Sequence, residues 1–425
     1  MGSGKSSWAI QTMNNTTDHY IYCTPFLDEV DRIKVSCKTR HFFEPTFFRG
    51  RKIDDFNMLL MEGKDIAVTH CTFANSNGET LKYLKGSNYT LILDEVLDVL
   101  VKYNDATNDT LSKADIKLLL NESFISVDDY GKVSWLKDSY PGGKYFNVER
   151  LAKNGHLFFL DNTMLVWQFP PEIFACFTSV YVLTYLFKGS MLKPYFEYHG
   201  LAYTMASVEK DGSQYSLSEW SDDRTKQLEY SSLIDICDNV KMNNFNGFSL
   251  SKTWYDRQGK SGTGVLAIQR NTKNYFKNVC KDSTPKDMMW TVYKDHKSAI
   301  SGKGYTRIRN LTPEEKRLPE RAKNKITNMT QCFVSCNARA TNDFADRNTL
   351  AYLINKYCDG FTKRYFANKN NIEGTDIHLD EDYFALSCML QWIWRSQIRN
   401  GKPIRIYIPS TRMRTMLQDW LQGKM

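Results

Sequence analysis

The chain has 425 residues, enough for two domains of ordinary size that each bury a hydrophobic core. Its residues are 42% hydrophobic and 24% charged, with no apolar run of the ~18 residues that a membrane span needs, which argues against a membrane protein and favours a cytoplasmic one. The surplus of 56 Lys and Arg over 48 Asp and Glu gives a net charge of +8 and favours a polyanionic partner. The ten cysteines include no Cys-x-x-Cys pair, so we expect reduced thiols.

The first seven residues match the second half of the phosphate-binding loop G-x-x-x-x-G-K-[ST]. In that motif Lys5 reaches the terminal phosphates, Ser6 binds the metal, and the whole loop surrounds the nucleotide through Gly2, Ser3, Gly4, Lys5, Ser6 and Ser7. A helix expected over residues 8–13 would turn its amino-terminal amides toward the phosphates. The first glycine of the motif and its strand would fall upstream of Met1, so we expect the chain to lack its true start. The alternative is a chance Gly-Lys-Ser near a terminus.

Three apolar runs then predict strands that end in polar residues. Residues 20–23 lead into Thr24-Pro25 and a helix from Phe26 that includes Arg32, residues 65–68 lead into Thr69-His70, and residues 91–93 lead into Asp94-Glu95. Two carboxylates at the end of a buried strand suit a magnesium nucleotide, because Asp94 can hold the metal through water while Glu95 polarises the attacking water. The apolar pattern that continues to Leu100 predicts that a helix begins at these carboxylates.

The next hundred residues predict an insertion and the end of the first domain. Residues 105–155 are polar and turn-rich, with a helix over 113–121 and a loop at 141–143. Strands over 156–161 and 179–185, around a helix near 171–177, predict a parallel, doubly wound sheet with its site at the strand carboxyl ends. Further on we expect a helix over 228–240, a loop rather than a second phosphate loop at 259–264, and a helix over 265–279.

A basic segment follows the strand expected over residues 288–294. Lys294 ends that strand, and four more cations come after it at Lys297, Lys303, Arg307 and Arg309. Together with the interleaved aromatics Trp290, Tyr293 and Tyr305, they favour single-stranded nucleic acid, through phosphate neutralisation and base stacking. A solvated basic loop fits the pattern equally well.

The last hundred residues predict a strand over 332–336, a helix over 383–399, a strand over 404–409 and a closing helix over 413–421. Gln391, Arg395 and Arg399 recur at i, i+4 and i+8 and so would share neighbouring faces of the long helix. The guanidinium fork suits the phosphate charge that spreads during hydrolysis.

The order of these motifs resembles the superfamily two helicases of the Asp-Glu-x-x type, and their compact style is similar to phage helicases. The resemblance implies an α/β fold with two RecA-like domains and mostly parallel sheets, with ATP and Mg²⁺ in the cleft between them. Domain one would cover residues 1–205 with an insertion near 105–155, and domain two residues 206–425, with a linker near 205–225. The catalytic residues that it implies are Lys5, Asp94, Glu95, Gln391, Arg395 and Arg399, with Ser6 and Asp94 on the metal. The nucleic-acid contacts that it implies are Thr24, Pro25, Arg32, Thr69, His70, Thr341 and Asn342, and the basic segment adds Lys294.

The expected function is therefore an ATP-dependent helicase or translocase that moves along a single strand, of DNA rather than RNA, in phage replication or recombination within the host cytoplasm. One alternative is a terminase-like packaging ATPase, whose nuclease would recruit acids such as Asp343, Asp346, Asp380 and Glu381. Another is a nucleic-acid-binding module that no longer hydrolyses nucleotide.

Overall fold

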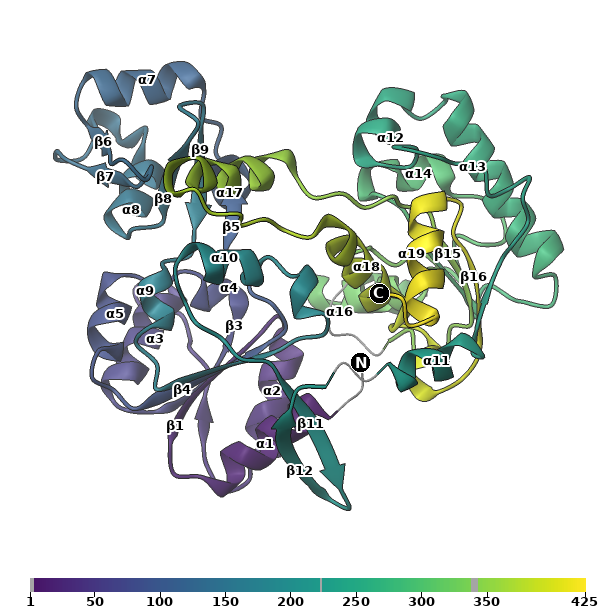
Figure 1. Cartoon of the computed structure of the whole chain (residues 1–425), viewed down its shortest axis with the longest axis horizontal. Helices are drawn as coiled ribbons and strands as arrows, with labels where there is room; N and C mark the ends of the chain where they lie inside the picture. Colours follow the sequence, from purple (N-terminus) through teal and green to yellow (C-terminus); the bar gives the residue numbers. More distant parts are fainter. Residues whose placement is uncertain (1–3, 222–223, 338–342) are drawn as a thin grey trace. The chain divides into compact units, whose positions relative to one another are not determined.

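The computed structural model describes residues 4–221, 224–337 and 343–425, which form two compact units (Figure 1). Of the described residues, the N-terminal unit contains 4–220 together with Asp359–Asp380. The C-terminal unit contains Ser221–Cys358 and Glu381–Met425. A short segment from late in the sequence therefore belongs to the N-terminal unit.

The N-terminal unit is built on a five-stranded sheet with the order β10-β4-β1-β3-β2, in which all neighbours are parallel. The strands are β1 (His19–Thr24), β2 (Phe42–Phe43), β3 (Asp65–Thr69), β4 (Tyr89–Asp94) and β10 (Ser179–Leu183). Strands β1 and β4 are buried along almost their whole length, as expected of parallel strands that are covered on both faces.

Helices cover both faces of this sheet because alternate strand residues point to opposite sides. One face packs Tyr20, Tyr22 and Ile92 against α1 (Lys5–Asn15) and α2 (Leu27–Ser36). The other face packs against a larger core that includes α3 (Lys52–Met61), α4 (His70–Phe73), α5 (Gly78–Leu84), α9 (Pro171–Phe174) and α10 (Leu192–Tyr198).

The insertion after β4 has a three-stranded antiparallel sheet of its own, with the order β5-β9-β8. Its elements are β5 (Leu100–Lys102), α6 (Tyr103–Thr107), α7 (Lys113–Asn121), β6 (Ile125–Val127), β7 (Val133–Trp135), a 3-10 turn (Pro141–Gly143), α8 (Phe146–Lys153), β8 (Leu157–Leu160) and β9 (Met164–Gln168). The strand expected over 156–161 is thus present, but its expected place in the parallel sheet is wrong. Apolar composition predicts a buried strand and does not identify its sheet.

Two further segments complete the N-terminal unit. A hairpin of β11 (Ala206–Asp211) and β12 (Gln214–Glu219) lies against α1, where Gln11 exchanges hydrogen bonds of 2.9 and 3.0 Å with the backbone of Tyr215. Helix α17 (Gly360–Glu373) packs on both the insertion and α10. Its Tyr365 donates to Gln168 of β9 and stacks on Tyr198 of α10 at 4.8 Å between ring centroids.

The C-terminal unit has a four-stranded parallel sheet with the order β13-β16-β15-β14. Its strands are β13 (Ile234–Ile236), β14 (Met288–Thr291), β15 (Thr349–Tyr352) and β16 (Ile404–Tyr407). Its helices are α11 (Thr225–Ser231), α12 (Lys252–Gln258), α13 (Thr263–Asn274) with a π turn (Tyr275–Val279), a 3-10 turn η4 (Lys294–His296), α14 (Lys297–Ile300), α15 (Pro313–Lys316), α16 (Glu320–Met329), α18 (Glu381–Ile393), a 3-10 turn η5 (Gln397–Asn400) and α19 (Thr411–Leu421). The α/β class with parallel sheets is confirmed.

Three predictions for this unit are wrong. The helix expected over 228–240 is α11 followed by β13, because the Ser231 and Ser232 hydroxyls bond back to helix carbonyls and end the helix. The strand expected over 332–336 is a single bridge from Phe333 to Trp290. The helix expected over 383–399 ends at Ile393, whose carbonyl accepts a 2.7 Å bond from Ser396.

Candidate nucleotide site

The polar strand ends of the N-terminal unit meet at one edge of its sheet. Asp94 ends the central strand β4 and pairs in register with Leu183 of β10, while Cys23 and Leu93 are aligned on the other side. Since all strands are parallel, their carboxyl ends share this edge, which is where open α/β sheets bind ligands.

Asp94 is held in a mostly buried environment. Burial raises the pKa of this carboxyl to about 6, against a smaller lowering by Tyr22. The Tyr22 hydroxyl is buried and has no hydrogen bond of standard geometry to any described residue. It is nevertheless near enough to Asp94 to affect the pKa of that carboxyl. Glu95 and Glu29 raise the pKa of Asp94 further, so the ionised form would gain from a bound cation.

Glu95 has a left-handed backbone, with φ of 68°. A non-glycine residue in that region is strained, and such residues gather at functional sites. Its amide donates to the Leu183 carbonyl at 3.2 Å, which holds the turn against β10. The helix expected to begin at these carboxylates is wrong, because residues 96–99 are irregular and bury Leu97 and Val99 in the core on the way to β5.

Helix α1 runs antiparallel to β1 and points its amino terminus toward the same edge. Beyond its C-terminal end, Thr16 bonds the hydroxyl of Tyr20, near the start of β1, at 2.8 Å. Trp8 packs on Tyr181 of β10, with ring centroids 5.0 Å apart. Tyr181 is aligned through Ile92 with Tyr22, which lies two residues after Tyr20 toward the carboxyl end of β1. Gly4 is one turn beyond Trp8, or about 6 Å, and so lies farther toward the carboxyl edge.

The loop before α1 is described from Gly4, which has φ of 80° and precedes a helix without any side-chain cap. Lys5, Ser6 and Ser7 form the first turn of α1, so the confirmed helix begins within the motif. Uncapped amides at a helix amino terminus favour an anion. The two other loop residues predicted to surround phosphate, Gly2 and Ser3, lie outside the described residues.

Tyr215 of the hairpin covers Gly4. A β-carbon at Gly4 would lie 2.4 Å from Cε1 of the Tyr215 ring, so only glycine fits this contact. Sequence reasoning missed Tyr215, because nothing local connects it with a loop more than two hundred residues earlier.

The residues predicted to contact nucleic acid in this unit have varied surroundings. Thr24 is fully buried, and its hydroxyl has no partner among the described residues. Thr69 caps α4, accepting from the Thr72 amide, and His70 is the first residue of that helix. Arg32 is exposed and pairs with Glu29 at 2.7 Å. Pro25 is half-buried between β1 and α2.

The residues predicted to complete the site from the C-terminal unit do not share one helix. Gln391 is half-buried in α18, Arg395 is 8% exposed in the turn that follows, and Arg399 is exposed in η5. Their expected i, i+4, i+8 spacing on one helix is wrong, because α18 ends at Ile393. The residues Thr341 and Asn342 lie outside the described part of the chain.

The basic segment is only partly as expected. Lys294 follows β14 and lines a pocket, while Trp290 and Tyr305 are fully buried and bond to backbone carbonyls. The expectation that these two rings stack on bases is therefore wrong.

Two features of the described residues bear on the alternative functions. Within residues 4–221, 224–337 and 343–425, no group of three or more His, Cys, Asp or Glu side chains is placed to hold a metal ion, so the acids considered for a nuclease do not form such a cluster. In those ranges no helix is long and apolar enough to cross a membrane.

Comparison with solved structures concerns the fold alone. The chain is similar to a structure titled XPD helicase, with a TM-score of 0.51 and 11% identity, covering 100% of this chain and 93% of that one. It also matches the structure of S. tokodaii Xpd4, with a TM-score of 0.46 and 11% identity, covering 98% of this chain and 92% of that one. The first likeness supports a helicase-like fold.

Comparison of sequences identifies the family. The model of the YonV C-terminal Rossmann-like domain matches residues 228–421, and that of the YonV middle domain matches residues 108–167, within the insertion. The SPbeta prophage-derived protein YonV of Bacillus subtilis strain 168 is 36% identical over 444 residues, covering 100% of this chain and 97% of that protein. The chain belongs to the YonV family.

Proposed function

We propose that this protein is an ATP-dependent nucleic-acid helicase or translocase of superfamily two. The observation that carries the proposal is the meeting of two motifs at one sheet edge: Asp94 and Glu95 end the central strand, and α1 points Gly4 and Lys5 toward the same edge. The helicase-like fold supports it.

The chain's own residues fit a magnesium nucleotide. Lys5 and the uncapped first turn of α1 would hold phosphate charge, with the rest of the loop at Gly2, Ser3, Ser6 and Ser7. Ser6 and Asp94 would hold Mg²⁺, which needs only one or two protein ligands when phosphates supply the others. The raised pKa of Asp94 supports this role, because a buried carboxylate gains from a cation. Bound ATP would supply the free energy for movement.

Glu95 would accept the proton of the attacking water. Its left-handed backbone fixes the carboxylate in a turn held by the bond to Leu183. Gln391, Arg395 and Arg399 of the C-terminal unit would complete the site and stabilise phosphate charge. The protein would move along a single strand that contacts Pro25, Arg32, Thr69, His70, Lys294, Thr341 and Asn342. Thr24 was expected in this set, but its side chain is fully buried and so cannot touch a strand in this conformation.

DNA is the proposed track, in phage replication or recombination within the host cytoplasm. A prophage-derived relative that matches the whole chain supports the phage setting, and the net charge of +8 suits a polyanion.

Glu95→Gln tests the proposal. The variant should bind ATP as the unchanged protein does but hydrolyse it at least 100-fold more slowly, because the amide cannot accept a proton. A matched control is Glu62→Gln, an exposed glutamate after α3, which should leave both properties unchanged. Nucleotide binding by fluorescence and phosphate release provide the two readouts. Full turnover by Glu95→Gln would contradict the assigned role, and a protein that neither binds nor hydrolyses ATP would favour a plain binding module.

A further inference from the structure

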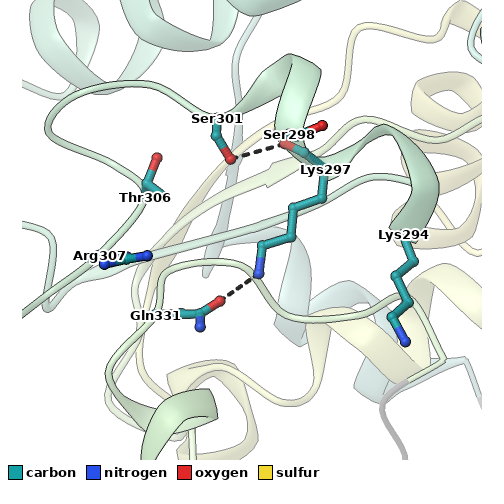
Figure 2. Close-up of a pocket in the computed structure, with 7 residues that line it drawn as sticks. All are labelled: Lys294, Lys297, Ser298, Ser301, Thr306, Arg307 and Gln331. Carbon is teal, nitrogen blue, oxygen red and sulfur yellow. Dashed lines mark hydrogen bonds between the residues drawn. The ribbon is translucent and has the colours of Figure 1, made fainter. Parts of the chain in front are cut away.

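A pocket of about 480 Å³ opens in the C-terminal unit beside the end of β14 (Figure 2). Two of its cations come from consecutive short helices after β14, and a third comes from the loop on the opposite side. Its lining residues are Lys294, Lys297, Ser298, Ser301, Thr306, Arg307 and Gln331. The pocket is therefore basic and is formed by segments that the fold brings together.

The positive charge in this pocket is not neutralised by the protein. Among the described residues, no carboxylate forms an ion pair with Lys294, Lys297 or Arg307, and the Arg307 side chain bonds only the amide oxygen of Asn310, at 3.1 Å. The next arginine in the same loop, Arg309, is different, because both its terminal nitrogens bond to Glu315 at 2.7 Å. Three neighbouring cations without a counter-charge favour an external anion.

Lys297 is fixed at the centre of this group. Its Nζ donates to Oε1 of Gln331 at 2.5 Å and lies 4.5 Å from the centroid of the Phe333 ring. Burial lowers the pKa of Lys297, and the charges of Arg307 and Lys294 lower it further. A bound anion would relieve this repulsion, and the preset position of the ammonium reduces the entropy cost of binding.

The hydroxyls divide into structural and available donors. Ser301 donates to the Lys297 carbonyl at 2.9 Å, and Thr306 donates to the Gly302 carbonyl at 2.7 Å, so both shape the pocket wall. The exposed Ser298 hydroxyl has no hydrogen bond to any described residue. The side-chain oxygen of Gln331 accepts from Lys297, which leaves the N–H groups of the same amide available as donors. The available groups are donors, as a phosphate needs.

We propose that this pocket binds a backbone phosphate of single-stranded nucleic acid, through Lys294, Lys297 and Arg307. The inference rests on the proposed function, in which Lys294 contacts the strand, and it adds Lys297 and Arg307 to that contact as one phosphate site. Because Trp290 and Tyr305 are buried, the pocket offers charge without a stacking ring at those positions, which makes the contact independent of base sequence.

The test measures binding of a fluorescent single-stranded oligonucleotide in the absence of ATP, so that a failure of hydrolysis cannot imitate the result. Lys294→Ala combined with Arg307→Ala should weaken binding at least tenfold at low salt. It should also flatten the dependence of log K on log salt by roughly 0.7 for each lost phosphate contact. Arg307→Lys should keep most of the affinity, because it retains the charge. Both substituted side chains are exposed, and circular dichroism checks the fold.

The same loop provides matched controls. Lys303 is exposed and does not line the pocket, and the charge of Arg309 is already neutralised by Glu315. Lys303→Ala and Arg309→Ala should each bind the oligonucleotide within twofold of the unchanged protein. Equal weakening by the controls would overturn the site in favour of diffuse attraction. Unchanged oligonucleotide binding by the double variant would overturn it too. The same holds if the double variant loses binding of inorganic phosphate or of polyglutamate but still binds the oligonucleotide.

Discussion

At the scale of single residues, Asp94 shows how the sheet edge prepares a site. Its pKa of about 6 in the folded chain lies above the value of ~3.9 for an unfolded chain, so the fold prefers the protonated form. The stability that this preference contributes is present below about pH 4 and is lost as the pH rises through 6. Ionised Asp94 thus lowers the free energy of unfolding at neutral pH.

Asp94→Asn should therefore stabilise the protein in the absence of nucleotide. The expected gain in the free energy of unfolding is about 3 kcal/mol at pH 8 and roughly half of that at pH 5, because the asparagine carries no charge to bury. Urea unfolding of both proteins across this pH range measures the difference. If the gain in the free energy of unfolding is the same at every pH, whatever its magnitude, the raised pKa of Asp94 is contradicted.

Residues with a local signal were predicted from the sequence, and those that depend on tertiary contact were not. Lys5 and Ser6 follow a glycine pattern, and Asp94 follows an apolar strand, so their positions could be predicted. Neither the strained backbone of Glu95 nor the ring of Tyr215 over Gly4 has a signature in its neighbours along the chain.

Among the elements, several regular runs were predicted, but α17, β13 and β15 were not, and several helix ends were wrong. The helix expected over 113–121 has those bounds, and the strands that carry Thr24, Thr69 and Asp94 are all present. The error at the end of α18 arose because periodicity continues to Arg399 although Ser396 ends the helix. Periodicity measures which face is apolar, whereas the end of a helix depends on how its last carbonyls are satisfied.

The hairpin on α1 constrains the loop that precedes this helix. Gly4→Ala should lower the free energy of unfolding by about 1–3 kcal/mol and weaken ATP binding, because alanine is strained at a φ of 80° and its β-carbon would meet the Tyr215 ring. Tyr215→Ala in the same chain should recover the steric part of the loss. A double-mutant cycle by thermal unfolding measures this coupling. Strict additivity would show that the ring does not press on the loop.

At the scale of the whole molecule, each unit repeats one plan: a parallel sheet with helices on its faces and a basic or acidic group at a strand end. In the N-terminal unit that group is Asp94 with Glu95 after β4, and in the C-terminal unit it is the cluster of Lys294, Lys297 and Arg307 near the end of β14. Segment Asp359–Asp380 belongs to the N-terminal unit although its neighbours in sequence on both sides belong to the other. Hydrophobic patterning predicted strands β1, β3, β4 and β10 of the first sheet, but it missed β13 and β15 of the second. It also could not assign this segment, because membership of a unit depends on distant contacts.

In the proposed helicase or translocase, ATP hydrolysis depends on a nucleic-acid strand. Steady-state phosphate release with and without single-stranded DNA or RNA measures this dependence. We expect the rate of the unchanged chain to rise at least fivefold with saturating DNA and less with RNA. The stimulation should weaken between about 50 and 200 mM salt as phosphate contacts are screened. Lys5→Ala should abolish both the basal and the stimulated rate. A rate that is the same with and without either strand, or that persists in Lys5→Ala, would contradict a nucleic-acid-dependent ATPase.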